Sequence, residues 1–301
     1  MQKIIDNIKQ GMLEAGYVCD NKTATVLYLA EALNKPIIVE GPAGVGKTGL
    51  AQAYSRMRNT TLIRLQCYEG IDESKALYEW NYKRQLLHIQ AIANKEVDID
   101  AVEQDIFTEK YLLSRPLLQS ISSPTPSVLL IDEIDKVDFE FEAMLLELLS
   151  EYQMSIPELG TVKARNIPCV FLTSNATREL SEALKRRCLW LYLDFPDSNL
   201  EKQILLLQVP GLTADMAGKI AAAAHQIRQL ELKKHPSIAE TLDWAYALLN
   251  MGIEDLDVNA TLQTLNIIVK HREDADKLEG LLRSRNDLSF QPGPASTRPW
   301  R

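Results

Sequence analysis

The chain has 301 residues and is 46% hydrophobic, which is enough for one large domain and a smaller one, each with a buried core. Lysine and arginine total 33 against 41 aspartates and glutamates, so the formal net charge is -8. Proteins that bind the nucleic-acid backbone usually carry a basic surplus, so no nucleic-acid partner is expected. A local basic stripe inside an acidic total would still allow one.

The cysteines and the N-terminal segment indicate the compartment. None of the four cysteines has CxxC spacing, which argues against a zinc site and against a disulfide framework: Cys19, Cys67, Cys169 and Cys188. The first twenty residues lack the apolar core of a signal peptide, and no apolar run approaches the length of a membrane span. The expectation is a cytoplasmic protein with reduced thiols and no membrane span.

Short apolar runs alternate with segments of helical periodicity in the first two thirds of the chain. Asp20 and Asn21 are suitable caps for a helix over 23–33. The apolar runs predict strands at 36–39, 61–65, 127–131, 169–173 and 190–193. Strands that alternate with helices favour a mostly parallel sheet covered on both faces, so the expected fold class is α/β.

The pattern changes after Phe195-Pro196-Asp197, where strand signals end and helical spacing remains. Ser198 and Glu201 have the spacing of a capping box, which predicts the start of the first helix. Three further helices are predicted at about 216–230, 242–249 and 262–269. The expected organisation is an α/β domain at 1–197, a small helical lid at 198–282 and a disordered tail at 283–301, which is rich in Ser, Pro, Arg and Asn.

A glycine-rich segment after the first predicted strand fits the pattern GxxxxGK[ST] and opens a predicted helix. Glycines let backbone N–H groups curl around phosphate oxygens, and the helix N-terminus adds a favourable dipole. Lys47 would contact the β and γ phosphates of ATP, and Thr48 would bind Mg²⁺. The alternative is a chance glycine turn. The predicted cofactor-binding residues are Gly41, Pro42, Ala43, Gly44, Val45, Gly46, Lys47, Thr48 and Gly49.

Two carboxylates, Asp132 and Glu133, end the apolar strand predicted at 127–131. The carboxyl ends of parallel strands line the ligand crevice of such sheets. Asp132 would hold the magnesium hydration shell, and Glu133 would orient and deprotonate the attacking water. A solvated turn is the alternative, which the phosphate loop earlier in the chain disfavours.

Two further features complete the candidate catalytic set. Asn175 follows another predicted strand and would place its amide between the γ phosphate and the water, although an Asn there is often only a turn residue. Arg186 and Arg187 precede the last predicted strand, and one of them would stabilise transition-state charge from a neighbouring subunit. The position directly before the strand favours Arg187. A surface pair without a role is the alternative.

These elements, in this order, resemble the Walker A, Walker B, sensor 1 and arginine-finger motifs of the AAA+ superfamily. The stretch 153–165 resembles a hairpin of the MoxR branch. Four strings resemble the subgroup that contains the carbon monoxide dehydrogenase maturation ATPase: Leu65-Gln-Cys-Tyr-Glu-Gly70, Ala76-Leu-Tyr-Glu-Trp-Asn81, Ala183-Leu-Lys-Arg-Arg-Cys188 and Ser237-Ile-Ala-Glu-Thr-Leu-Asp-Trp244. The resemblance implies a P-loop fold, and a chaperone-like homo-hexamer that remodels a protein client beside a partner with a von Willebrand factor A domain.

Two segments depart from this resemblance. Many members carry a sensor 2 arginine in the lid, but Pro236-Ser-Ile-Ala-Glu240 has none; Ser237 and Glu240 have capping-box spacing, and Lys233 or Lys234 would substitute. The second departure is a long insert at 66–127, in which Trp80, Tyr82 and Arg84 alternate. These side chains either pack against the sheet or contact a client. An acidic segment at 98–105 is interpreted as a solvated helix face.

Three functions are compatible with these motifs. The first is a motor in which magnesium-dependent ATP hydrolysis drives a ring that acts on a protein. The second is a nucleotide-gated scaffold that hydrolyses little ATP. The third is a DNA-directed AAA+ ATPase. The Asp132–Glu133 pair with the arginines favours the motor, and the acidic balance disfavours DNA.

Overall fold

The computed structural model describes residues 1–92, 102 and 105–284. The chain divides into two compact units: one contains 1–41 and 47–193, and the other contains 42–46 and the chain from 194 on. Most of the acidic segment predicted at 98–105, and the predicted tail from residue 285 on, lie outside the described residues. Within the described ranges, no helix is long and apolar enough to cross a membrane.

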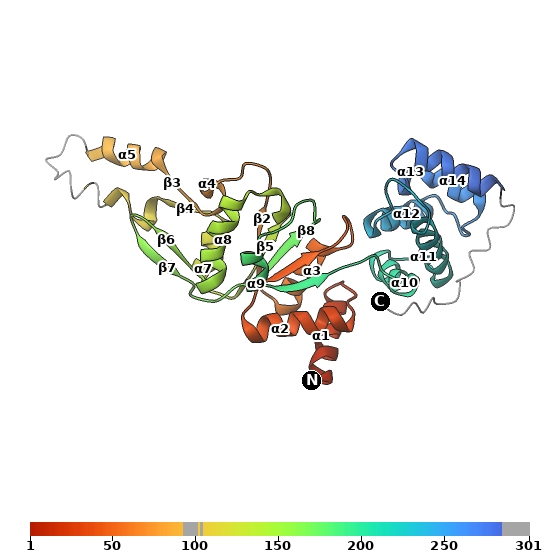
Figure 1. Ribbon diagram of the computed structural model, residues 1–301, viewed down its shortest axis with the longest axis horizontal. Helices are drawn as coiled ribbons and strands as arrows, with labels where there is room; N and C mark the ends of the chain where they lie inside the picture. The colour runs from red at the N-terminus through yellow and green to blue at the C-terminus, as the bar shows by residue number, and fades with distance from the viewer. Residues whose placement is uncertain (93–101, 103–104, 285–301) are drawn as a thin grey trace. The chain divides into compact units, whose positions relative to one another are not determined.

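The first unit is built on a five-stranded sheet in the order β2-β5-β8-β1-β9 (Figure 1). All neighbouring strands are parallel, which confirms the predicted α/β class with a mostly parallel sheet. The strands coincide with the five predicted apolar runs: β1 Ile37–Glu40, β2 Thr61–Gln66, β5 Ser127–Asp132, β8 Cys169–Ser174 and β9 Leu189–Tyr192.

Both faces of the sheet are covered, and β1, β2, β5 and β8 alternate their apolar side chains between two apolar clusters. On β5, Val128 and Leu130 join one cluster, whereas Leu129 and Ile131 join the other. The first cluster is completed by α1 Gln2–Glu14, α2 Asn21–Leu33 and α3 Lys47–Arg58. The second is completed by α7 Pro116–Ser122, α8 Phe139–Glu151 and α9 Glu182–Arg187. The helix α1 was not predicted, although Ile5, Ile8 and Met12 form its buried stripe.

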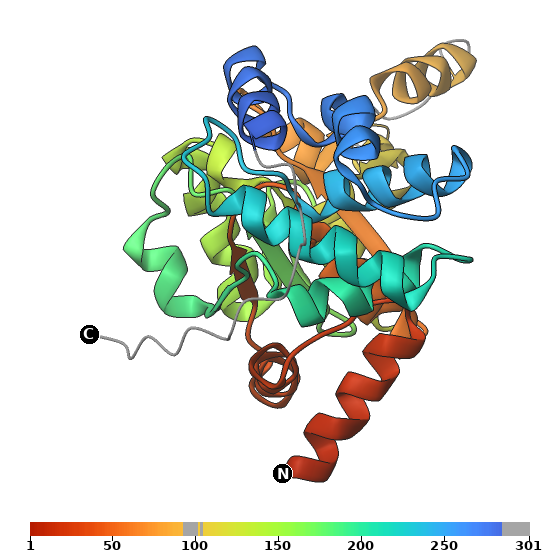
Figure 2. The same ribbon diagram turned by 90° about the vertical axis from the view of Figure 1, so that its right-hand side faces the viewer.

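The insert forms a small substructure at one edge of the first unit. It contains α4 Glu73–Ala76, β3 Tyr78–Trp80, α5 Tyr82–Ile92, a 3₁₀ turn at Glu109–Tyr111, and β4 Leu112–Ser114, which pairs antiparallel with β3. Figures 1 and 2 show α5 extending outward from the sheet. Trp80 is 6% exposed and packs edge-on against Phe107, with ring centroids 5.2 Å apart. Trp80 is therefore a core residue, whereas Tyr82 is 63% exposed.

The segment after α8 forms the antiparallel hairpin expected at 153–165. Its strands are β6 Gln153–Ile156 and β7 Gly160–Lys163. Met154 and Ile156 are buried in the core of the first unit, so one face of the hairpin is anchored.

The four cysteines are free thiols. Burial raises the pKa of Cys19 to about 11 and the pKa values of Cys67, Cys169 and Cys188 to about 12. All four therefore carry protonated, unreactive sulfur at neutral pH.

The second unit is helical: α10 Ser198–Gln208, α11 Ala214–Arg228, α12 Ile238–Asn250, α13 Val258–Ile268 and α14 Arg272–Ser284. Its core is organised around Trp244, which is fully buried and donates its indole N–H to the Thr264 hydroxyl at 2.7 Å. The first four helices match the predicted segments. The fifth was not predicted, and it extends through Ser284 into the segment that was expected to be a disordered tail.

One of the two predicted capping boxes is present. Ser237 and Glu240 form it reciprocally at the start of α12. The prediction for Ser198 and Glu201 was wrong, because Asp197 caps α10 by accepting the Leu200 N–H at 2.8 Å. The Glu201 carboxylate is instead fully buried and accepts two hydrogen bonds from the Arg228 guanidinium, at 2.6 and 2.7 Å.

We expect Arg228→Met to destabilise the second unit by about 3 kcal/mol, because it leaves the buried Glu201 carboxylate without its counter-ion. Amide exchange in α10 and α11, followed by mass spectrometry, should accelerate on the order of a hundredfold. The double variant Arg228→Met/Glu201→Leu removes both charges and should recover most of the protection. Parental exchange in the single variant would contradict the assignment.

Candidate nucleotide site

The predicted phosphate loop has the backbone that its glycines permit. Gly41, Gly44 and Gly46 have φ angles of 151°, 76° and 97°, which side-chain-bearing residues rarely adopt. The loop follows β1, and Lys47 is the first residue of α3. Backbone N–H groups between a strand and a helix N-terminus form a favourable anion cradle. The residues present therefore fit the phosphates of a nucleotide.

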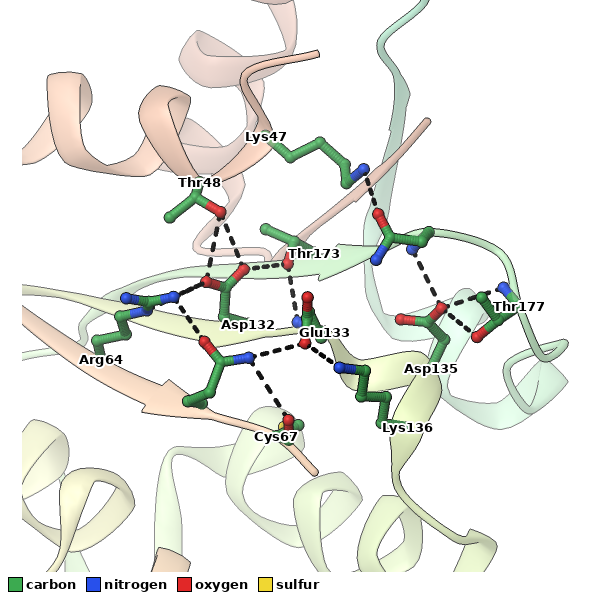
Figure 3. A network of polar contacts seen from close by, with 12 residues as sticks. Lys47, Thr48, Arg64, Cys67, Asp132, Glu133, Asp135, Lys136, Thr173 and Thr177 are labelled. Carbon is green, nitrogen blue, oxygen red and sulfur yellow. Dashed lines mark hydrogen bonds and ion pairs between the residues drawn. The ribbon is translucent and has the colours of Figure 1, made fainter. Parts of the chain in front are cut away.

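Lys47 joins this loop to the residue predicted as sensor 1. Its ammonium donates to the Gly41 carbonyl at 2.7 Å and to Asn175 Oδ1 at 2.8 Å. Burial lowers the pKa of Lys47, and the carboxylates of Asp135, Asp132 and Glu133 oppose that effect in this order. Figure 3 shows the Lys47 side chain reaching toward the carboxyl ends of the strands.

Asp132 is the buried carboxylate at the end of β5. The Thr48 hydroxyl lies 3.1 Å from Asp132 Oδ1 and 3.3 Å from Oδ2, and the Thr173 hydroxyl donates to Oδ1 at 2.5 Å. A hydroxyl and a carboxylate are the hard oxygen ligands that Mg²⁺ prefers, and this ion is usually held by one or two carboxylates together with phosphate oxygens. Thr48 and Asp132 therefore fit a magnesium ion.

Glu133 turns away from the strand directly after Asp132. Its φ of 61° is left-handed, a conformation that costs a non-glycine residue on the order of 1–2 kcal/mol. The Glu133 N–H donates to the Thr173 hydroxyl at 2.9 Å, which stabilises this turn. The Glu133 carboxylate accepts hydrogen bonds from Lys136 at 2.5 Å and from Gln66 at 2.9 Å (Figure 3). Adjacent residues thus present their carboxylates to different surroundings.

Asp135 positions the loop that carries Asn175 and was not predicted as a site residue. It accepts the Asn175 N–H at 3.2 Å, the Thr177 N–H at 3.0 Å and the Thr177 hydroxyl at 2.6 Å. Burial favours a higher pKa for Asp135, but these hydrogen bonds outweigh it and the pKa is lowered. The Asp135 carboxylate therefore stays ionised and ties β5 to the loop after β8.

A second cluster that was not predicted comes from β2, which neighbours β5. Arg64 donates to Asp132 Oδ2 through Nη2 at 2.5 Å and Nε at 3.1 Å, and it also contacts Gln66 Oε1 at 2.5 Å. Both residues are polar positions that alternate with the apolar Ile63 and Leu65 in β2, and Gln66 is in register with Asp132. Alternating polar residues at the carboxyl end of a sheet strand are the signal that would have indicated them.

The two candidate arginines lie apart from this network, on α9. Both are exposed at the C-terminal end of the helix. Arg187 donates to the Ser150 hydroxyl at 2.5 Å and to the Ala183 carbonyl at 3.2 Å, which holds it against α8. In the second unit, Lys233 pairs with Glu273 and Lys234 pairs with Glu240, each at 2.9 Å.

We expect Thr173→Val to destabilise the first unit by roughly 1–3 kcal/mol, because it removes the hydroxyl shared by the Asp132 carboxylate and the Glu133 N–H. Thr173→Ser keeps that hydroxyl and should remain near the parental stability. Urea unfolding followed by far-UV circular dichroism measures both. Equal losses in the two variants would show that the methyl packing of Thr173 matters and that its hydroxyl does not.

Comparison with known proteins shows which family the chain belongs to. Two curated relatives are uncharacterized proteins. One, from Staphylococcus aureus (strain bovine RF122 / ET3-1), is 25% identical over 199 residues, which cover 62% of this chain and 66% of that protein. The other, from Staphylococcus epidermidis (strain ATCC 35984 / DSM 28319 / BCRC 17069 / CCUG 31568 / BM 3577 / RP62A), is 27% identical over 197 residues. The chain spans about two thirds of the length of such relatives or slightly less.

Among solved structures, the Thermotoga maritima RuvB Holliday junction branch migration motor is similar at 16% identity, with a TM-score of 0.47, over 84% of this chain and 69% of that one. A single-residue variant of the same RuvB gives a TM-score of 0.49 at 15% identity, over 90% and 70%. The family model for the AAA domain (dynein-related subfamily) matches residues 36–188, a segment that holds β1, β2, β5 and β8 of the parallel sheet and ends just before β9. Since this match extends over just more than half of the sequence, the chain belongs to the AAA domain family, dynein-related subfamily.

Proposed function

We propose that the protein is a magnesium-dependent ATPase of the MoxR branch, closest to the subgroup of the carbon monoxide dehydrogenase maturation ATPase. The observation that carries this proposal is the convergence of one polar network from separate segments. Lys47 and Thr48 open α3, Asp132 ends β5, Glu133 follows it, and Asn175 follows β8. A network of this kind has little use in a structural turn but serves phosphate binding and water activation.

Each residue has a separate role in the proposed reaction. Backbone N–H groups of the phosphate loop and the Lys47 ammonium bind the phosphates. Thr48 and Asp132 would hold Mg²⁺, which supplies charge neutralisation on the phosphates when bound. Glu133 orients the attacking water and accepts its proton, and Asn175 helps to position that water. The loop held by Asp135 keeps Asn175 beside Lys47.

We expect Lys47→Ala to abolish ATP binding and Glu133→Gln to bind ATP while turning it over at least 10²-fold more slowly. Fluorescent-nucleotide binding and phosphate release measure the two steps separately. Glu140→Gln, an exposed carboxylate on α8, is the matched control and should keep parental rates. Parental turnover by the Glu133→Gln protein would show that another group activates the water.

We further propose that the protein works as a homo-hexameric ring in the cytoplasm, with an α/β domain at 1–197 and a lid at 198–282. Arg187, or else Arg186, would then complete the site of the neighbouring subunit. Exposure of both arginines is compatible with this role, and the hydrogen bond to Ser150 holds Arg187 in place at the end of α9.

Mixing two inactive variants tests the shared site. In rings assembled from Glu133→Gln and Arg187→Ala subunits, some interfaces pair an intact glutamate with an intact arginine, so ATPase activity should partly return. Subunit exchange is verified by pull-down through a tag on one variant. Absence of recovery in mixed rings contradicts Arg187, and the same experiment with Arg186→Ala then tests its neighbour.

The client of this ATPase would be a protein, remodelled or matured beside a partner with a von Willebrand factor A domain. A nucleotide-gated scaffold with little hydrolysis is the second candidate, because Glu133 is held by Lys136 and Gln66 and would have to leave these contacts in order to act. The turnover of the parental protein distinguishes the two. A DNA-directed ATPase is disfavoured by the net charge of -8.

A further inference from the structure

The Asp132 oxygen that does not contact Thr173, Oδ2, is paired with a positively charged side chain of the protein itself. The Arg64 guanidinium approaches Oδ2 with two nitrogens, at 2.5 and 3.1 Å, which is a directed, charge-assisted contact. The Asp132 side chain is only 4% exposed, whereas that of Arg64 is 48% exposed. A buried carboxylate is thus neutralised by a side chain that reaches it from solvent.

The proposed metal-binding group and this ion pair compete for one carboxylate. Thr48 and Thr173 contribute neutral hydroxyl groups, so Arg64 supplies the only full positive charge that contacts Asp132 among the described residues. A doubly charged ion bound between Thr48 and Asp132 would repel a guanidinium on the same carboxylate, strongly so at a partly desolvated site. Bound Mg²⁺ therefore weakens the contact between Arg64 and Asp132.

We propose that Arg64 neutralises Asp132 in the absence of metal and moves away when Mg²⁺ enters with the nucleotide. This competition from Arg64 sets the magnesium concentration that the protein requires. This inference rests on the proposed function, in which Asp132 holds the metal. Arg64 is free to leave toward solvent because it lies at the exposed side of β2. When Arg64 moves away, the side-chain oxygen Oε1 of Gln66 loses its hydrogen bond. The amide N–H₂ group of the same Gln66 side chain donates to Glu133, so metal entry also alters the surroundings of the proposed base.

The test measures binding, without turnover. A fluorescent, non-hydrolysable ATP analogue is titrated with the full-length protein in EDTA and then at increasing Mg²⁺. Arg64→Met keeps the length of the side chain and removes the charge, so the Mg²⁺ concentration for half-maximal tightening should fall about three- to tenfold. Arg64→Lys keeps the charge without the bidentate geometry and should lie between the two.

Arg58→Met is the matched control, because it also removes one arginine from a partly exposed ion pair, the pair with Glu31, outside the site. It should leave the magnesium requirement unchanged. An unchanged or higher requirement in Arg64→Met overturns the proposal. Weaker binding in EDTA with an unchanged magnesium requirement also overturns it, because Arg64 would then contact the nucleotide itself.

Two checks keep these outcomes distinct. Far-UV circular dichroism establishes that each variant is folded, and Arg64→Gln takes the place of Arg64→Met if the latter is not. If the parental protein does not bind the analogue, or binds it identically in EDTA and Mg²⁺, then the proposed function itself fails. The comparison of the Arg64 variants is decisive only if nucleotide binding by the parental protein depends on Mg²⁺. A fall in the magnesium requirement then supports the inference.

Discussion

The structure depends most on accommodating one carboxylate, Asp132, that is buried at the end of a central strand. An unpaired carboxylate in this position would be prohibitively costly, so its surroundings must supply hydrogen bonds or positive charge. Hydroxyl groups from α3 and β8 and a guanidinium from β2 supply them. Segments far apart in the sequence are thereby drawn to one point.

The parallel sheet makes this convergence possible. Because all of its strands run in the same direction, the carboxyl ends of β1, β5 and β8 lie at one edge: β5 ends at Asp132, β8 is followed by Asn175, and β1 leads along the chain toward Lys47. The left-handed turn at Glu133 then places two adjacent carboxylates among different partners. Thr173 stabilises both, since its hydroxyl donates to Asp132 and accepts from the Glu133 backbone.

Local chemistry explains which features could be predicted. Apolar runs located the five strands of the parallel sheet, and Gly41 to Thr48 indicated the phosphate loop, because both signals lie within a few neighbouring residues. Asp135 and Thr173 could not be found in this way, since their contacts arise only when separate strands are brought together. Arg64 has a local signal, its polar position in β2, but its contact with Asp132 likewise depends on the pairing of two strands. The capping-box prediction for Glu201 was wrong for the same reason. Its spacing matches a capping box, but an arginine distant in the sequence pairs with its carboxylate. The α1 stripe was simply overlooked.

The most direct test of the account is a structure of the protein with Mg²⁺ and a non-hydrolysable ATP analogue. The account predicts the β and γ phosphates within hydrogen-bonding distance of Lys47 Nζ, the metal at about 2.1 Å from Thr48 Oγ1, and Asp132 facing the metal hydration shell. Triphosphate density away from the Gly41 to Thr48 loop, or a metal held by other residues, would contradict it.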